Sequence, residues 1–126
     1  MATNKNKILI VDDDKFLIDM YSIKFTENGY DVVAAFGAKE AIEKIDQGFV
    51  PDICLVDIIM PGTDGFQLVS ELKKKDQLKD TTIIFLTNLG QQDDIDKGLG
   101  LGADGYIVKA SATPSEVVSK VADIVK

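Results

Sequence analysis

ILIVDDD, residues 8–14, places four consecutive apolar side chains directly before three aspartates. The apolar run does not alternate with polar residues, so we interpret it as a strand buried on both faces, as in a parallel sheet with helices on each side. Further short runs rich in Val, Ile and Phe favour the same interpretation. They occupy residues 32–36, 53–56, 83–86 and 106–108.

Segments of helical length separate these runs, and their apolar residues recur at the spacing of one helix face. The predicted helices cover residues 14–28, 38–47, 64–75, 91–101 and 114–126. Thr113 and Glu116 predict a capping box at the start of the last helix, with proline at its first position. The fourth helix contains Gly98, Gly100 and Gly102, which disfavour helix, so we expect it to be short, frayed or mobile.

Five strands that alternate with five helices predict a doubly wound α/β fold with a parallel sheet. Two sheet orders are common for such chains, the dinucleotide type and the flavodoxin type. The length of 126 residues fits one domain, residues 1–126. We expect the polar residues 1–6 to form a loosely ordered tail, and no second domain to follow the last helix.

The composition excludes several classes of function. The chain carries 14 basic and 21 acidic side chains, a net charge of −7, which argues against binding to nucleic acid or to an anionic membrane. No apolar run approaches the length of a membrane span. A single cysteine, Cys54, fits a reduced, cytoplasmic setting. The chain has no histidine, so it cannot supply an imidazole base, nucleophile or metal ligand.

Charged and hydroxyl side chains stand where the predicted strands end. Since the carboxyl ends of parallel strands meet at one edge of a sheet, we expect these side chains to gather there. They are Asp12, Asp13 and Asp14 after the first strand, Asp57 after the third, Thr87 after the fourth and Lys109 at the end of the fifth. Taken singly, an acid at such a place is often a helix cap, and we assign that role to Asp14.

The combination of these residues favours phosphoryl chemistry. Asp12, Asp13 and Asp57 would form an oxygen-only pocket suited to Mg²⁺, which offsets the repulsion between carboxylates. An aspartate beside Mg²⁺ and an ammonium group is a workable nucleophile toward a phosphoryl group. Lys109 and Thr87 would then stabilise the oxygens of the transferring group.

Four strings carry a resemblance to a known family, and together they span most of the chain. ILIVDDD (8–14), LVDIIMPGTDG (55–65), IIFLTN (83–88) and GYIVK (105–109) resemble the receiver domain of two-component response regulators, in particular its single-domain, chemotaxis-type members. The resemblance implies the flavodoxin-type sheet order 2-1-3-4-5. It also implies that Asp57 is the phosphoacceptor, that Asp13 binds Mg²⁺ directly and Asp12 directly or through water, and that the backbone carbonyl of Ile59 is a further ligand.

The resemblance assigns three more roles. Lys109 would pair with the phosphoryl oxygens, Thr87 would donate a hydrogen bond to one of them, and Tyr106 would be the aromatic switch residue. Tyr106 could alternatively be a core residue. Phosphorylation would change the face made by the fourth helix, fifth strand and fifth helix. Pro61 and Gly65 would only shape the loop after the third strand.

The partners follow from the missing histidine. The phosphoryl group would come from a histidine on a sensor kinase or phosphotransfer protein, or from a small acyl phosphate. An unknown downstream protein would bind the switched face, and the chain would be a monomer or a phosphorylation-dependent dimer. It would be no enzyme beyond its own phosphorylation and slow dephosphorylation.

The sequence departs from the family's commoner pattern around the site. Ala110 follows Lys109 where proline is usual, so the bond between them is either trans or a strained cis bond. Ile59 and Leu89 cannot orient an attacking water, and Asn88 is bulkier than the usual small residue. We therefore expect a long-lived aspartyl phosphate.

Three other functions compete with this interpretation. A haloacid-dehalogenase-type phosphatase needs a second acid at the position of Ile59, and a flavodoxin-type flavin module needs a phosphate-binding loop where this chain has Asp12–Asp14. A degenerate receiver that serves only as an interaction scaffold is disfavoured because all five site positions are filled.

Overall fold

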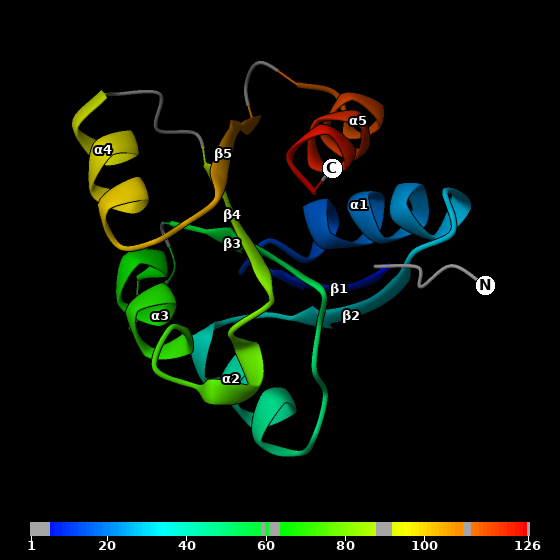
Figure 1. The fold of residues 1–126 in the computed structure, drawn as a ribbon. Coiled ribbons are helices and arrows are strands. Elements are labelled where there is room, and N and C mark those ends of the chain that lie inside the picture. The colour runs from blue at the N-terminus through cyan, green and yellow to red at the C-terminus, as the bar shows by residue number, and fades with distance from the viewer. Residues whose placement is uncertain (1–5, 59, 61–63, 88–91, 110–111, 126) are drawn as a thin grey trace.

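The computed structural model describes residues 6–58, 60, 64–87, 92–109 and 112–125. Five parallel strands form one sheet in the order β2-β1-β3-β4-β5, and helices cover both of its faces (Figure 1). This is the flavodoxin-type order, so the predicted fold class is confirmed. The strands are β1 (Lys7–Val11), β2 (Asp31–Ala35), β3 (Ile53–Asp57), β4 (Thr82–Thr87) and β5 (Gly105–Val108).

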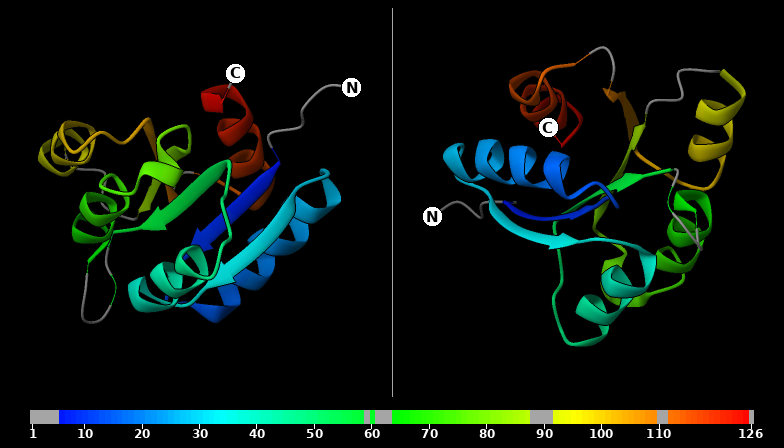
Figure 2. Two further views of the ribbon diagram at one scale, coloured as in Figure 1. Left: turned by 60° about the horizontal axis from the view of Figure 1, so that its bottom comes forward. Right: turned by 180° about the vertical axis from the view of Figure 1, so that it is seen from behind.

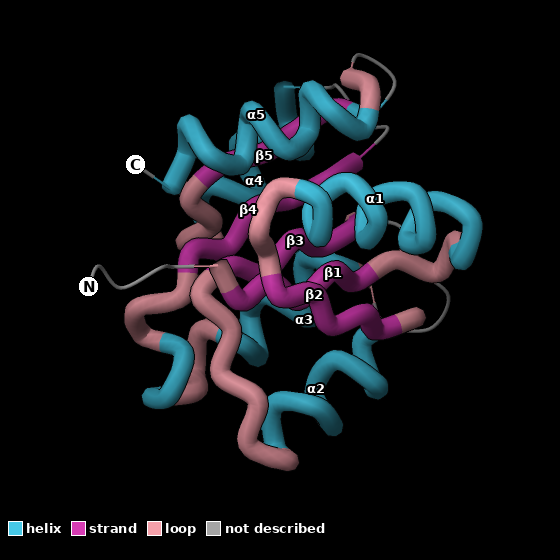
Figure 3. The backbone as a smooth tube through the Cα atoms, turned by 90° about the vertical axis from the view of Figure 1, so that its right-hand side faces the viewer, coloured by secondary structure: helices cyan, strands magenta, loops and turns pink. Residues whose placement is uncertain are grey.

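In the described residues, α-helices α1 to α4 and one 3₁₀ turn connect the strands, and α5 follows the last strand. Figure 2 shows α1 and α5 side by side on one face of the sheet and α2, α3 and α4 on the other. Figure 3 shows these layers from the side, with the strands between α1 and α5 on one side and α2 and α3 on the other. The helices are α1 (Lys15–Glu27), α2 (Ala38–Asp46), α3 (Gly65–Leu72), η1 (Asp76–Leu78), α4 (Gln92–Gly100) and α5 (Pro114–Val125).

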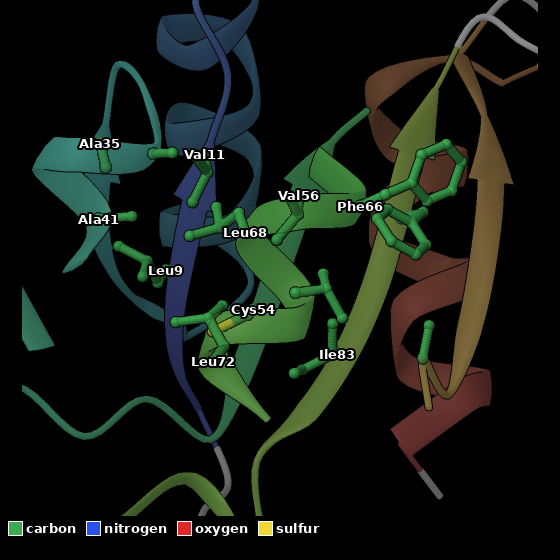
Figure 4. Packing of buried hydrophobic residues seen from close by; sticks show 14 of the residues in the cluster. Leu9, Val11, Ala35, Ala41, Cys54, Val56, Phe66, Leu68, Leu72 and Ile83 are labelled. Atoms are coloured by element: carbon green, nitrogen blue, oxygen red, sulfur yellow. The ribbon is translucent and has the colours of Figure 1, made fainter. Parts of the chain in front are cut away.

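The strands are buried on both faces, as their unbroken apolar runs predict. In β1, Leu9 and Val11 pack into the core under α2 and α3, whereas Ile8 and Ile10 pack into the core under α1 and α5. Figure 4 shows part of the first core, where side chains from the strands meet those of α3. The two cores are thus separate layers that share the sheet between them.

Predicted helix ends are confirmed where side chains cap them. The Asp14 carboxylate accepts hydrogen bonds from the backbone amides of Phe16 and Leu17. At the start of α5 the Thr113 hydroxyl accepts from the amide of Glu116, 3.2 Å away, and the Glu116 carboxylate accepts from the amide of Thr113 at 2.8 Å. These reciprocal bonds satisfy amides that have no partner within the helix.

Several predicted ends differ from the observed ones, and two of these differences have a visible cause. Helix α3 ends at Leu72 rather than at residue 75, because the chain tightens into 3₁₀ turns that carry the next apolar residue, Leu78, into the core at 2% exposure. Strand β2 ends at Ala35, because the amide of Phe36 binds the carboxylate of Glu40 at the start of α2 instead of a neighbouring strand.

The glycine-containing fourth helix forms over 9 residues, Gln92–Gly100, and its mobility stays a prediction. Asn6, at the end of the expected tail, is fixed by a hydrogen bond from its side chain to the carbonyl of Gly29 at 2.9 Å. Residues 1–5 lie outside the described residues. Within the part of the chain that the structure describes, no helix is both long and apolar enough to cross a bilayer.

Candidate functional site

The sheet brings the predicted site residues to one edge. Asp57 is the last residue of β3 and Thr87 the last of β4, while Asp12 and Lys109 directly follow β1 and β5. Val11 lies opposite Val56 and Thr87 opposite Val108, so the neighbouring strands end level with one another. The register of the sheet therefore brings the ends of four strands to the same edge.

Lys109 joins the two buried carboxylates of this cluster. Its ammonium Nζ lies 2.6 Å from Oδ2 of Asp12 and 3.3 Å from Oδ1 of Asp57. Asp12 is 1% exposed and the side chain of Lys109 8%. The other oxygen of Asp12 accepts a hydrogen bond from the amide of Asp14 at 3.0 Å, which fixes the orientation of the carboxylate.

Three carboxylates are arranged so that they could hold a cation. Asp12, Asp13 and Asp57 each offer an oxygen, and these oxygens lie within 4.8 Å of one another. Asp13 is exposed while the other two are buried, so the group opens to solvent on the side of Asp13. An all-oxygen set with an open side fits Mg²⁺, which takes a few carboxylates and keeps several waters.

The charges of the cluster shift its proton equilibria. Burial raises the pKa of Asp57 to about 6; the charges of Asp12 and Asp13 add to this shift, and Lys109 opposes it. For Lys109, burial lowers the pKa, but the hydrogen bond to Asp12 and the charge of Asp57 outweigh burial and raise it overall. The ammonium is therefore the internal counterion of an otherwise repulsive acidic group.

The two predicted switch residues occupy different environments. Thr87 is 1% exposed at the end of β4. Tyr106 in the edge strand β5 is 40% exposed, so it is not a core residue. Its neighbour Ile107 packs into the core under α1 and α5, which places Tyr106 on the opposite face of the sheet, where α4 lies.

Gly65 has a closer relation to the site than its sequence indicated. It is the first residue of α3, and its amide donates to the carbonyl oxygen of Ile58 at 2.7 Å. A Cβ at this position would lie 2.7 Å from the Cα of Ile58 and closer still to the carbonyl oxygen of Asp57. Helix α3 can therefore abut the backbone of Asp57 only because position 65 has no side chain. A glycine after a strand and loop does not by itself reveal such a contact.

Several predictions concern residues outside the described ones. The carbonyl of Ile59, the lifetime argument from Asn88 and Leu89, the bond between Lys109 and Ala110, and the loop role of Pro61 all fall there. Met60, which the structure does describe, is 6% exposed and packs in the core under α2 and α3.

Comparison with known proteins gives consistent results for sequence and structure. Residues 8–122 match the response regulator receiver domain. The chemotaxis protein CheY4 of Vibrio cholerae superposes with a TM-score of 0.88 at 28% identity, over 94% of this chain and 98% of that one. A CheY-like receiver domain protein of Methanospirillum hungatei gives 0.85 at 29% identity, over 95% and 93%.

A third similar structure contains a partner and a ligand. It is the CheX-CheY-BeF3-Mg complex of Borrelia burgdorferi, with a TM-score of 0.85 at 29% identity, over 94% of this chain and 88% of that one. Each of the three matches covers at least 94% of this chain.

Proposed function

Because the chain belongs to the response regulator receiver domain family, and so to signalling proteins that typically bind Mg²⁺ at an acidic cluster, we propose that Asp57 is its phosphoacceptor. The observation that carries this proposal is the contact of Asp57 and Asp12 with the Lys109 ammonium, at 3.3 and 2.6 Å. A buried carboxylate with an attached cation and two further acids is a site prepared for a charged reactant.

Asp12, Asp13 and Asp57 would hold Mg²⁺, with the backbone carbonyl at position 59 as a further ligand. When bound, the ion neutralises charge on the carboxylates and on the transferring oxygens. The remaining chemistry belongs to the chain. Lys109 keeps a positive charge beside Asp57, and Thr87 at the end of the next strand provides a hydroxyl donor.

The transfer step forms one bond and breaks another. A carboxylate oxygen of Asp57 attacks phosphorus, the bond from phosphorus to the donor imidazole breaks, and the imidazole leaves with the electron pair of that bond. The chain has no histidine, so the donor is a histidine of another protein or a small acyl phosphate. We assign the protein donor to a sensor kinase or histidine phosphotransfer protein.

Phosphorylation would act as a switch. The new group brings about two negative charges and strong acceptor oxygens, which attract Lys109 and the Thr87 hydroxyl. Tyr106, on the α4 side of the sheet, would turn inward as Thr87 moves. The face formed by α4, β5 and α5 would then bind a different partner, in the cytoplasm, as a monomer or as a phosphorylation-dependent dimer.

Intact-mass measurement with acetyl phosphate and Mg²⁺ tests this proposal. We expect one phosphate adduct on the wild type, none on Asp57→Asn and none when Mg²⁺ is chelated. Asp19→Asn, which neutralises an exposed carboxylate on α1, is the matched control and should be labelled like the wild type. An adduct that persists in Asp57→Asn would contradict the assignment.

The same measurement decides the alternative function, an interaction scaffold that works without phosphorylation. A wild type that stays unlabelled by acetyl phosphate and by phosphohistidine donors would favour the scaffold. Once labelled, the protein should lose its phosphate slowly, which a time course after removal of the donor measures.

A further inference from the structure

Helix α4 packs against the sheet at Gly98, a position without a side chain. A Cβ added to Gly98 would lie 2.7 Å from both Cδ2 and Cε2 of Phe85 in β4. Phe85 is 2% exposed, so its ring is enclosed by the core and has little room to turn. The Phe85 ring therefore fills the space beside Gly98, and no room is left for a Cβ at position 98.

The contact is specific to this position of the helix. Gly100 lies in the same helix, yet a Cβ there would meet no described atom within 4 Å. Glycine disfavours helix at both positions, so propensity alone does not distinguish them. The Phe85 ring supplies a steric reason for glycine at position 98, whereas position 100 offers none.

A second aromatic ring extends the contact to α3. The rings of Phe66 and Phe85 meet edge to face with their centroids 5.3 Å apart. Lys97, the residue before Gly98, places its ammonium 4.6 Å from the centroid of the Phe66 ring. Figure 4 shows Phe66 reaching from α3 toward the side of the cluster where β4 runs. Helix α4 thus meets the Phe85 ring at Gly98 and the Phe66 ring through Lys97.

Phe85 is also a neighbour of both predicted switch residues. It precedes Thr87 by two residues in β4, so both side chains are on the same face of the sheet. In the neighbouring strand its register partner is Tyr106. A shift at the end of β4 therefore moves a ring that touches α4 without intervening space, and close-packed contacts of this kind transmit displacement.

We propose that Gly98 and Phe85 form a positioning pair that couples the phosphorylation site to α4, an inference that rests on the proposed function. With glycine at 98, α4 follows the Phe85 ring directly. With alanine at 98, the helix is pushed off the ring, and the movement of β4 no longer determines the position of α4.

The first test is a double-substitution cycle measured by urea unfolding. Gly98→Ala should lower the folding equilibrium constant about tenfold, as expected for an overpacked core. Gly100→Ala, the matched control, should leave it unchanged or raise it by up to about fourfold through helix propensity alone. In a Phe85→Leu background, whose flexible methyl groups can turn away, Gly98→Ala should lose its penalty. Equal effects of the two glycine substitutions in the wild-type background would overturn the steric pair, even if the leucine variant failed to fold.

The second test is hydrogen exchange of the α4 amides with and without beryllofluoride and Mg²⁺. In the wild type and in Gly100→Ala we expect ligand binding to change the exchange of residues 92–100. In Gly98→Ala that change should fall by more than half, while labelling of Asp57 by acetyl phosphate stays within twofold of wild type. An undiminished α4 response, or a parallel loss of labelling, would overturn the coupling. Failure of the wild type to be labelled would instead overturn the proposed function, and the coupling with it.

Discussion

The buried carboxylate of Asp57 should destabilise the metal-free protein, and replacing it with asparagine should reverse that effect. Its pKa rises from 3.8 to about 6 on folding, chiefly through burial. Between these values the native state binds more protons than the unfolded state, so this group's contribution to stability falls as the pH rises from about 4 to about 6. This change in the pKa of Asp57, from 3.8 to about 6, corresponds to a loss of about 3 kcal/mol in folding stability at neutral pH.

Asparagine resembles the protonated aspartate in shape and cannot ionise. We therefore expect Asp57→Asn to be more stable than wild type by up to about 3 kcal/mol at pH 7.5, equivalent to roughly 10 °C in Tm for a domain of this size. Near pH 4 most of this advantage should vanish, because the wild-type carboxyl is then protonated as well.

Urea and thermal unfolding in the presence of a chelator, at several pH values between 4 and 7.5, measure this difference. Asp19→Asn makes the same change in net charge at an exposed position of α1, and its stability difference from wild type should not vary in the same way with pH. Saturating Mg²⁺ should narrow the gap by stabilising the wild type. An asparagine variant no more stable than wild type at pH 7.5, or equally favoured at pH 4 and pH 7.5, would refute the reasoning.

Three further predictions concern other contacts. Lys109→Met leaves the buried Asp12 without its counterion and should lower the free energy of unfolding by about 3 kcal/mol at neutral pH, as measured in urea. It should also slow labelling by acetyl phosphate at least tenfold. Unchanged stability would contradict the ion-pair geometry. Thr113→Ala should cost about 1 kcal/mol through loss of the α5 cap, whereas Thr113→Ser should cost much less, and equal unfolding midpoints for the two would argue against the cap. Burial raises the pKa of the Cys54 thiol to about 12, so a thiol reagent should modify the protein only at the rate of its unfolding; rapid modification of the native state would contradict the burial of this side chain.

Much of the fold could be predicted because burial determines both the pattern of apolar residues in the sequence and the layers of the structure. The unbroken apolar run in β1 divides its side chains between two cores, and this division is what the absence of alternation indicates. Caps such as Asp14 and Thr113 were predictable for a different reason, since their hydrogen bonds join residues two or three positions apart. Sequence order alone left two sheet orders open, and the resemblance to receiver domains selected between them.

The errors in the predicted elements come from contacts over longer distances. The early end of α3 accompanies the burial of Leu78 in the core, and Lys75 in the turn forms a salt bridge to Asp46 of α2 at 3.0 Å. Neither contact is visible in the helical spacing of residues 64–75. The ends of helices are set by whichever tertiary contact comes next, which a local pattern does not contain.

The position of the candidate residues at one edge of the sheet was predictable, whereas their contacts with the rest of the chain were less so. Strand ends identified Asp12, Asp57, Thr87 and Lys109, because position at the sheet edge follows from topology. The contact of Gly65 with the backbone of Asp57 could not be predicted, since a missing side chain leaves no chemical signature and its importance depends on what lies opposite. The same holds for Gly98, which the sequence presents only as a poor helix former.

The carboxylate cluster stands at strand ends, whereas the outer sides of the helices form separate surfaces. Because the sheet separates its two cores, substitutions on the outside of α1 or of α4 alter one layer and leave the other layer and the carboxylate cluster in place. Descendants of such a protein can therefore acquire new binding partners through changes in one helix while the chemistry of the carboxylate cluster is retained.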